Sequence, residues 1–341
     1  MTDLASGEAQ ADGHDRAQNT VFSLGLYRTM VRIREFELEA ERLFLANEIP
    51  GFIHVSIGQE AVAAGVCAGL EADDFMTTTH RGHGHTIAKG ASMRGMMAEL
   101  FGRASGVCGG MGGSMHIADF SIGMLGANGI VAGGIGLAVG AALQAKLASK
   151  PQVAVAFFSD GATARGPFSE ALNLAQLWRL PVVFACENNG WASTTRSIES
   201  LSQPQVAVRA ESMGVTSVVV DGNDVFEVAD AATEALSRAR QGGGPTLIEA
   251  ATYRLRGHYV GDPVMYYDPA ELQEWSLRDP ITTCERSLSA SGPGNRDLYS
   301  DIAVEARAEV ADAVAYARNS PWPDPRSLAS RVYADRTSSE I

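Results

Sequence analysis

The chain has 341 residues, of which 45% are hydrophobic, so it is long and apolar enough to bury a large core. Its formal net charge of −13 argues against a nucleic-acid partner. The four cysteines are widely spaced and the polar N-terminus lacks a signal-peptide pattern, which favours a cytoplasmic protein with reduced thiols.

The first third of the chain is predicted to be helical, between segments without regular structure. Residues 1–20 are polar and are expected to be disordered. Helices are predicted at 24–47, 59–70 and 93–101. A glycine-rich loop follows over 102–136, and its length favours a functional role. The apolar stretch 130–147 is interrupted by glycines and by Gln144, which indicates a loop leading into a buried helix and argues against a membrane span.

The centre of the chain alternates strands with helices. Strands are predicted at 153–158, 181–186, 215–220 and 246–250, and helices at 166–178 and 225–240. This alternation predicts an α/β fold with a doubly wound, mostly parallel sheet that binds ligands at the carboxyl ends of its strands. Residues 270–318 are predicted to be helical. We therefore expect one domain over 21–320 with helical extensions at both ends, and an extended tail over 321–341 that could dock on a partner.

Two polar motifs follow neighbouring predicted strands. Asp160 follows the strand at 153–158, and Asn188-Asn189 follow the strand at 181–186. Because a parallel crossover brings the carboxyl ends of its strands to one edge, Asp160 and Asn189 should meet there. Carboxylate and amide oxygens suit Mg²⁺, and the N-terminus of the helix near Gly166 favours phosphate. This unit can hold a metal diphosphate.

The sequence of residues 160–189 resembles the thiamine diphosphate motif. It reads D-G-A-T-A-R-G-P-F-S-E-A-L-N-L-A-Q-L-W-R-L-P-V-V-F-A-C-E-N-N. It is similar to the alpha subunits of 2-oxo acid and acetoin dehydrogenase complexes. The resemblance implies the thiamine-diphosphate-binding fold with Mg²⁺ held by Asp160, Asn189 and the backbone carbonyl of Trp191. It also implies cofactor contacts from Gly161 and Ala162. For D-G and N-N alone, an ordinary crossover with a capping Asp and a turn Asn pair is the alternative.

The segment H-R-G-H-G-H at 80–85 could be a zinc site, but its glycines indicate a flexible tract with no carboxylate or thiol nearby. Within T-T-T-H-R-G-H-G it resembles the alpha-subunit segment in which an arginine grips the cofactor diphosphate and a histidine lines the active site. The resemblance implies that Arg81 clamps the diphosphate. It also implies that His83 handles protons or orients the substrate.

Residues 252–263, T-Y-R-L-R-G-H-Y-V-G-D-P, resemble the family loop in which a histidine contacts the diphosphate or the reaction intermediate. That makes His258 a cofactor-binding and catalytic candidate, with a surface loop residue as the alternative. In animal relatives the next residue is a regulatory serine. Tyr259 stands there in this chain, so that form of control is expected to be absent.

The glycine patches at 109–119 and 126–136 let the backbone approach a ligand closely. By resemblance, Gly129 and Val131 contact the cofactor and His116 lies on the substrate side. A packed glycine loop under a helix is the alternative for each. The chain departs from the family pattern at Ser159, at Thr163-Ala164-Arg165, at Gly190-Trp191-Ala192 and at Met111. None of these changes removes a predicted metal ligand, but Arg165 and Met111 could alter the mouth of the site.

The resemblance implies an oxidoreductase alpha subunit that uses thiamine diphosphate to cleave acetoin or decarboxylate a 2-oxo acid. The product would pass to a lipoyl acyltransferase. No glutamate for the cofactor's aminopyrimidine was identified, so a beta subunit in an α2β2 assembly is expected to supply it. His80 before Arg81, and G-A-N-G-I-V at 126–131, favour acetoin. Pyruvate or branched-chain 2-oxo acids, acyloin transfer, and a non-catalytic diphosphate-binding subunit stay open. A nicotinamide enzyme is disfavoured because no G-x-G-x-x-G pattern is suitably placed.

Overall fold

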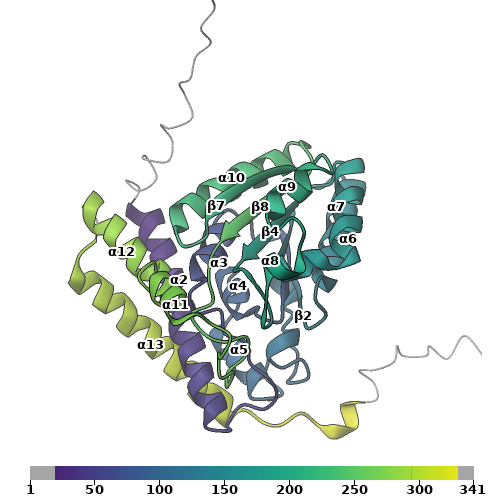
Figure 1. Ribbon diagram of the computed structural model, residues 1–341. Helices are drawn as coiled ribbons and strands as arrows, with labels where there is room; N and C mark the ends of the chain where they lie inside the picture. Colours follow the sequence, from purple (N-terminus) through teal and green to yellow (C-terminus); the bar gives the residue numbers. More distant parts are fainter. Residues whose placement is uncertain (1–19, 293, 329–341) are drawn as a thin grey trace, which may run out of the picture.

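A six-stranded sheet in the order β2-β1-β3-β4-β8-β7 forms the centre of the computed structural model, which describes residues 20–292 and 294–328 (Figure 1). Every neighbouring pair in this sheet runs parallel, which confirms the predicted doubly wound α/β class. Its strands are β1 (Phe75–Thr79), β2 (Met124–Asn128), β3 (Ala154–Ser159), β4 (Val182–Asn188), β7 (Thr216–Asp221) and β8 (Thr246–Ala251). A separate antiparallel pair is formed by β5 (Trp191–Ala192) and β6 (Thr195–Arg196).

The sheet is buried on both faces, so its central strands are almost continuously apolar. In β3, Ala156 and Phe158 pack into one core, whereas Val155 and Phe157 pack into the other. The first core includes α6 (Gly133–Leu147), α7 (Gly166–Leu177) and α9 (Val206–Glu211). The second includes α3 (Glu60–Cys67), α4 (His83–Ala88), α5 (Met93–Leu100) and α10 (Val225–Arg240).

The two ends of the domain form a helical layer beside this second core. The long helices α2 (Thr20–Leu45) and α13 (Arg296–Asn319) lie side by side, with α12 (Pro280–Ser291) packed on α2 (Figure 1). Helix α11 (Pro269–Ser276) precedes α12 and stacks Trp275 on Tyr253. Helix α2 therefore begins four residues earlier than expected, at Thr20. The rest of the predicted disordered segment lies outside the described residues.

The first residues of the predicted C-terminal tail pack back onto this chain. The backbone N–H of Ala104 donates to the carbonyl of Pro321 at 2.9 Å. The guanidinium of Arg103 lies over the Trp322 ring, 3.7 Å from its centroid. The start of the tail therefore buttresses the entry to the glycine-rich segment, and residues 329–341 lie outside the described residues.

The prediction of an unstructured loop over 102–136 is wrong in its second half. Strand β2 lies there and pairs with β1, with an irregular register between Met76 and Thr77. Its sequence, Met-Leu-Gly-Ala-Asn, has no β-branched residue, so local propensity gives no strand signal. Helix α6 follows as expected, but it is not fully buried within this chain, because Leu137 is 53% exposed and Leu147 is 77% exposed.

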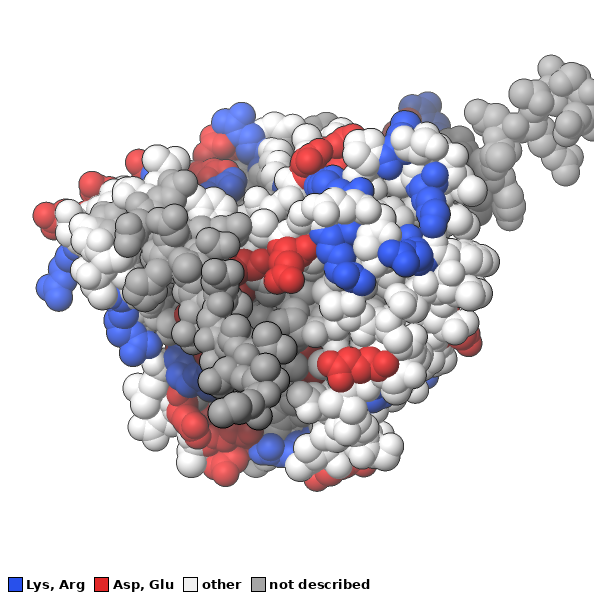
Figure 2. All heavy atoms as spheres, turned by 90° about the horizontal axis from the view of Figure 1, so that it is seen from above, with Lys and Arg blue, Asp and Glu red and all other residues white. Residues whose placement is uncertain are grey.

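The surface mixes charges of both signs. On the face shown in Figure 2, basic and acidic side chains lie interspersed. Many arginines are engaged in ion pairs, such as Arg278 with Asp221 at 2.8 Å. Among the described residues, no helix is both long and apolar enough to cross a membrane.

Candidate active site

The carboxyl ends of β1, β3 and β4 converge on a cavity of about 370 Å³. Strands β3 and β4 are direct neighbours with Ser159 opposite Glu187, so the residues that follow them lie at one edge, as predicted. Seven predicted site residues line the cavity: Arg81, Gly129, Val131, Gly161, Asn189, Trp191 and His258. The cavity is also lined by Arg165, which was expected at its mouth, and by residues that were not assigned a site role: His54, Thr79, His80, Met115, Ser159, Glu187, Ala192, Ser193 and Arg254.

Asp160 opens a short 3-10 turn directly after β3 and is fully buried. Its Oδ2 accepts a hydrogen bond from the Ser197 hydroxyl, whereas its Oδ1 has no hydrogen-bond partner among the described residues. Burial raises the pKa of this carboxyl to about 6, against the opposing hydrogen bond from Ser197. A buried carboxylate oxygen without a partner is costly, and a bound cation would satisfy it.

The side-chain amide of Asn189 is oriented by its neighbours. Its Nδ2 donates to Gln59 Oε1 at 2.9 Å, and its Oδ1 accepts from the Trp191 backbone N–H at 3.2 Å. Asp160, Asn189 and the Trp191 carbonyl together offer a carboxylate, an amide and a backbone oxygen. Hard oxygen donors of this kind fit Mg²⁺ with positions left for phosphate oxygens.

The departure at Thr163 has a structural explanation. Its hydroxyl donates to the carbonyl of Asp160 at 2.7 Å, which ties the turn together. Arg209 donates to both the hydroxyl and the carbonyl of Thr163, each at 2.6 Å. Arg165 is an exposed cavity-lining residue, as expected for the mouth of the site, whereas Met111 does not line the cavity.

Two arginines make one wall of the cavity cationic. Arg81 is buried and donates to the backbone carbonyls of Val55 and His258, the latter at 2.9 Å. Burial, followed by the neighbouring charge of Arg254, lowers the pKa of Arg81 to about 10, so it is still charged near neutral pH. Arg254 donates to Ser193 O at 2.8 Å, while its buried Nε has no hydrogen-bond partner among the described residues. This wall suits a diphosphate.

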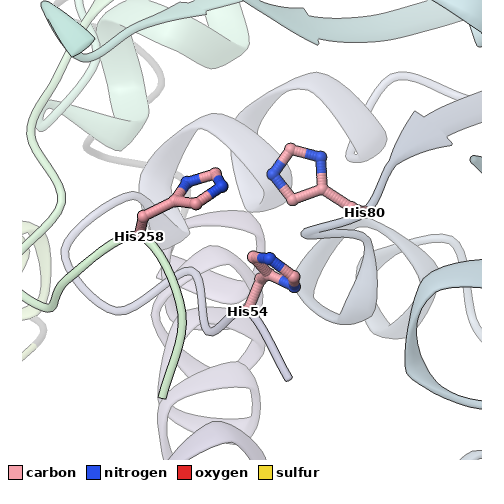
Figure 3. Close-up of side chains that lie close together, drawn as sticks. All are labelled: His54, His80 and His258. Carbon is pink, nitrogen blue, oxygen red and sulfur yellow. The ribbon is translucent and has the colours of Figure 1, made fainter. Parts of the chain in front are cut away.

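Three histidines from distant segments converge on the same cavity. Figure 3 shows the rings of His54, His80 and His258 facing one another. Their centroids are 4.6 to 5.4 Å apart, and one ligand atom from each lies within 4.8 Å of the others. Burial, with the charge of Arg81 second, lowers their pKa values to about 3, 2 and 4, respectively. All three rings are therefore neutral at pH 7.

The spacing of these rings would allow a metal ion, but their surroundings favour an oxygen atom of a ligand. Arg254 Nη1 lies 3.0 Å from His258 Nδ1. Because a guanidinium can only donate, Nδ1 must accept and the ring proton of neutral His258 lies on Nε2. A second cation would also be repelled by Arg81 and Arg254. The cluster therefore offers neutral N–H donors to an oxygen atom of a ligand.

His83 and His85 lie on α4 and not in a loop. The ring of His83 is fully buried, with Nδ1 3.2 Å from Glu37 Oε2 and Nε2 2.8 Å from Ser114 Oγ. His85 Nε2 lies 3.2 Å from Glu187 Oε1. The expectation that no carboxylate is near these histidines is wrong, because folding brings both glutamates from distant elements. His83 does not line the cavity. Its direct contact with the substrate therefore stays a prediction.

The other expected residues lie around the cavity. His116 borders Gly129, because a Cβ added to this glycine would be 3.5 Å from His116 Nε2. Ala162 is buried behind the turn and does not line the cavity. Glu187 is a cavity-lining carboxylate that sequence reasoning missed, but His85 and Gln59 already contact it.

The cavity-lining residues that were not predicted differ in how clearly the sequence indicates them. Arg254 lies within the T-Y-R-L-R-G-H motif, four residues before His258, so its motif could have identified it. His54 lies between Ile53 and Val55 without any local pattern that indicates a ligand.

We expect Gly161→Ala to weaken Mg²⁺-dependent cofactor binding. A Cβ at this position would lie 2.8 Å from Ala192 Cβ and 3.0 Å from its Cα, so the β5–β6 hairpin would have to move. Overpacking of this kind costs about 1–3 kcal/mol, or roughly 5- to 150-fold in affinity if it falls on the bound state. Titration of thiamine diphosphate in the presence of Mg²⁺ would measure the effect.

Gly25→Ala in α2 is the matched control. Apart from the adjacent residues and the backbone of α2 itself, no described heavy atom lies within 4 Å of the added methyl group, and alanine in place of glycine in a helix stabilises by about 0.5–1 kcal/mol. Unchanged cofactor affinity in Gly161→Ala would show that the hairpin takes no part in the site.

The fold and the cavity define a diphosphate-binding α/β enzyme subunit. Residues 28–326 match the family model described as "Dehydrogenase E1 component", and the chain belongs to this family of thiamine-diphosphate-dependent dehydrogenase components. This match confirms the resemblance found in the sequence.

Similar proteins come from two branches. The chain is 46% identical to the alpha subunit of acetoin:2,6-dichlorophenolindophenol oxidoreductase of Bacillus subtilis, over 91% of this chain and 93% of the relative. It is 42% identical to the corresponding subunit of Cupriavidus necator, with the same coverage. It is 39% identical to the pyruvate dehydrogenase E1 component subunit alpha of Porphyra purpurea, over 92% of this chain and 93% of the relative.

Proposed function

We propose that this chain is the alpha subunit of a thiamine-diphosphate-dependent dehydrogenase that cleaves acetoin and needs Mg²⁺. The observation that carries the proposal is the cavity in which Asn189 and Gly161 face the cationic wall of Arg81 and Arg254. Buried Asp160, directly beside Gly161 in the chain, adds a carboxylate oxygen that has no hydrogen-bond partner among the described residues. The two similar proteins at 46% and 42% identity are named as acetoin oxidoreductase subunits, which favours acetoin over pyruvate.

Bound thiamine diphosphate would supply the carbon nucleophile for carbon–carbon bond cleavage. The residues of this chain bind and orient it. Asp160, Asn189 and the Trp191 carbonyl would hold the metal, and Arg81 the diphosphate. His258 would donate its Nε2 proton in a hydrogen bond to a reacting oxygen, since Arg254 fixes its tautomer.

The charged groups of the cavity do not require a carboxylate group on the substrate, which supports a neutral substrate. Arg81 and Arg254 are committed to backbone carbonyls and to His258, and they face the predicted diphosphate. The cluster of His54, His80 and His258 is uncharged, so it suits the hydroxyl and carbonyl oxygens of acetoin. Arg165, exposed at the cavity, is the residue that would favour a 2-oxo acid, which keeps pyruvate as the second candidate.

A beta subunit completes the proposed enzyme in an α2β2 assembly. Large apolar side chains on α6 and at the end of α7 are exposed in the single chain, among them Leu137, Leu147, Leu177 and Trp178. A partner that covers them would remove this apolar surface from water. The partner would also supply the glutamate for the aminopyrimidine, because Glu187 is engaged with His85 and Gln59. A lipoyl acyltransferase is the proposed acceptor of the product.

The test uses this chain co-expressed with its beta subunit, in the presence of Mg²⁺ and thiamine diphosphate. Reduction of dichlorophenolindophenol is followed with acetoin, pyruvate and 3-methyl-2-oxobutanoate. We expect acetoin to be preferred by at least about tenfold in kcat/KM. Preference for an oxo acid would assign the chain to the 2-oxo acid dehydrogenases instead. Bound cofactor with no reduction would support acyloin transfer or a non-catalytic subunit.

A further inference from the structure

The first part of the glycine-rich segment, residues 106–113, folds around one carboxylate. Glu99, near the end of α5, is fully buried. Its Oε2 accepts the backbone N–H groups of Cys108 at 2.8 Å and Gly110 at 2.9 Å. Its Oε1 accepts those of Gly112 at 2.7 Å and Gly113 at 3.1 Å. We call Glu99 and these four N–H groups the Glu99 clasp.

The glycines of this segment are required by the clasp itself. A Cβ on Gly106 would lie 2.3 Å from Glu99 Oε2 and 2.6 Å from Glu99 Cα. Gly110 has a φ of +77°, and a Cβ there would lie 2.6 Å from the carbonyl carbon of Gly102. Close packing and backbone conformation therefore explain glycine at both positions.

Four converging N–H groups would otherwise form an anion-binding nest. In this chain the internal carboxylate of Glu99 already occupies it. The clasped segment is therefore unsuited to holding the phosphates of a ligand, although it is rich in glycine. Its role must come from the residues that it positions.

The clasp ends directly before two residues that matter for the cavity. Ser114 follows Gly113 and contacts His83 Nε2 at 2.8 Å. Met115 comes next and lines the cavity. On its other side His83 contacts Glu37 of α2, whose Oε1 also accepts the Ser56 hydroxyl at 2.9 Å. The clasp and this buried chain thus fix one wall of the cavity to the helical layer.

We propose that Glu99 is a positioning residue: its carboxylate replaces a bound anion and holds residues 106–113 so that Ser114 and Met115 form a fixed wall of the cofactor cavity. The geometric part stands on the contacts above, and the effect on cofactor rests on the proposed function.

The variant Glu99→Gln keeps the size of the side chain but turns one acceptor oxygen into a donor that faces N–H groups. Asp74→Asn is the matched control. Asp74 is also a fully buried carboxylate that accepts two backbone N–H groups, from Val153 and Glu71, each at 2.8 Å, and unlike Glu99 it pairs in addition with Arg240. It lies before β1, at the opposite edge of the sheet from the cavity.

Hydrogen exchange of the full chain with its beta subunit tests the clasp. In Glu99→Gln, peptides covering 106–115 should exchange at least about tenfold faster, because buried N–H groups lose their acceptors. In Asp74→Asn their exchange should be unchanged, although the Tm falls. Unchanged exchange in Glu99→Gln, or equal acceleration in both variants, would overturn the proposal.

Kinetics separate positioning from a general loss of structure. With Glu99→Gln, the apparent Kd for thiamine diphosphate should rise at least about fivefold, while kcat at saturating cofactor stays within about twofold. A fall in kcat alone would contradict the positioning role. If no substrate is turned over, cofactor titration and hydrogen exchange still decide the role of Glu99, so its failure differs from failure of the proposed function.

A second variant changes the glycine-rich segment and leaves Glu99 unchanged. In Gly112→Ala the added Cβ would lie 2.6 Å from the carbonyl oxygen of His116, so the clasp must open. If Glu99→Gln does not fold, Gly112→Ala should show the same local acceleration of exchange and the same weaker cofactor binding. A normal exchange pattern in this variant would overturn the proposal independently.

Discussion

Replacement of Asp160 by alanine is expected to abolish Mg²⁺-dependent binding of thiamine diphosphate. The carboxylate is fully buried at the end of β3, and its Oδ1 lacks a hydrogen-bond partner among the described residues. Loss of an outer-shell partner of a metal ligand already costs about 10–100-fold in affinity, so loss of the ligand itself should cost at least about 100-fold, or ~2.7 kcal/mol. Isothermal titration with and without Mg²⁺ would measure it.

Ser197→Ala is the matched control for this prediction. It removes the hydroxyl that donates to Asp160 Oδ2 but leaves both carboxylate oxygens in place. We expect a loss of affinity of about tenfold, at the lower end of the range for an outer-shell partner. If Asp160→Ala bound the cofactor as tightly as the unchanged chain, with the same Mg²⁺ dependence, the metal assignment would be wrong.

The pKa of Asp160 adds a test in the absence of metal. Burial raises this pKa from 3.8 to about 6, so the folded chain binds a proton more tightly than the unfolded chain does. The contribution of Asp160 to stability should therefore decrease as the pH rises from about 4 to 6. Thermal unfolding of the metal-free chain should show this trend, and Asp160→Asn should flatten it. An identical pH dependence in both proteins would contradict the predicted shift.

The second large effect is expected from Arg81→Gln. The guanidinium is buried in the cavity wall and ties the backbone of His258 to that of Val55. A hydrogen bond to a charged group contributes about 1.5–3 kcal/mol, so cofactor affinity should fall by roughly 10–150-fold. The same change frees the loop that carries His258, so kcat should fall as well.

Arg94→Gln provides the comparison for Arg81. Arg94 forms an exposed pair with Asp312, neither residue lines the cavity, and exposed pairs contribute little. Cofactor titration and steady-state kinetics on both variants would separate a local loss of binding from a general effect of charge. Equal cofactor affinity and equal kinetics in the two variants would show that Arg81 does not bind the diphosphate.

Local sequence was sufficient for the β3–α7–β4 unit. Its strands are apolar on both faces, its helix has a regular pattern, and the residues after each strand are polar. Because parallel strands end at one edge, the proximity of Asp160 and Asn189 follows from the order of these elements. The same reasoning gave the class of the fold, whereas most of the seven predicted cavity-lining residues came from the family resemblance.

Local sequence was insufficient where backbone pairing or side-chain packing decides the structure. Strand β2 has no β-propensity of its own and exists because it pairs with β1. The helical start at His83 depends on close packing, since a Cβ on Gly84 would lie 3.0 Å from Ser56 Oγ and 3.1 Å from Ile33. Neither contact leaves a periodic pattern in the sequence.

The sequence by itself determined the fold class, the edge of the sheet that holds the site, and the resemblance to the dehydrogenase family, because all three depend on short segments whose order is enough. Only the tertiary structure decided which histidines face the cavity. It places His54, His80 and His258 together and buries His83 between Glu37 and Ser114. The physical reason is that these contacts join residues far apart in the chain, and they form only when α2, α4 and the loops pack against the sheet.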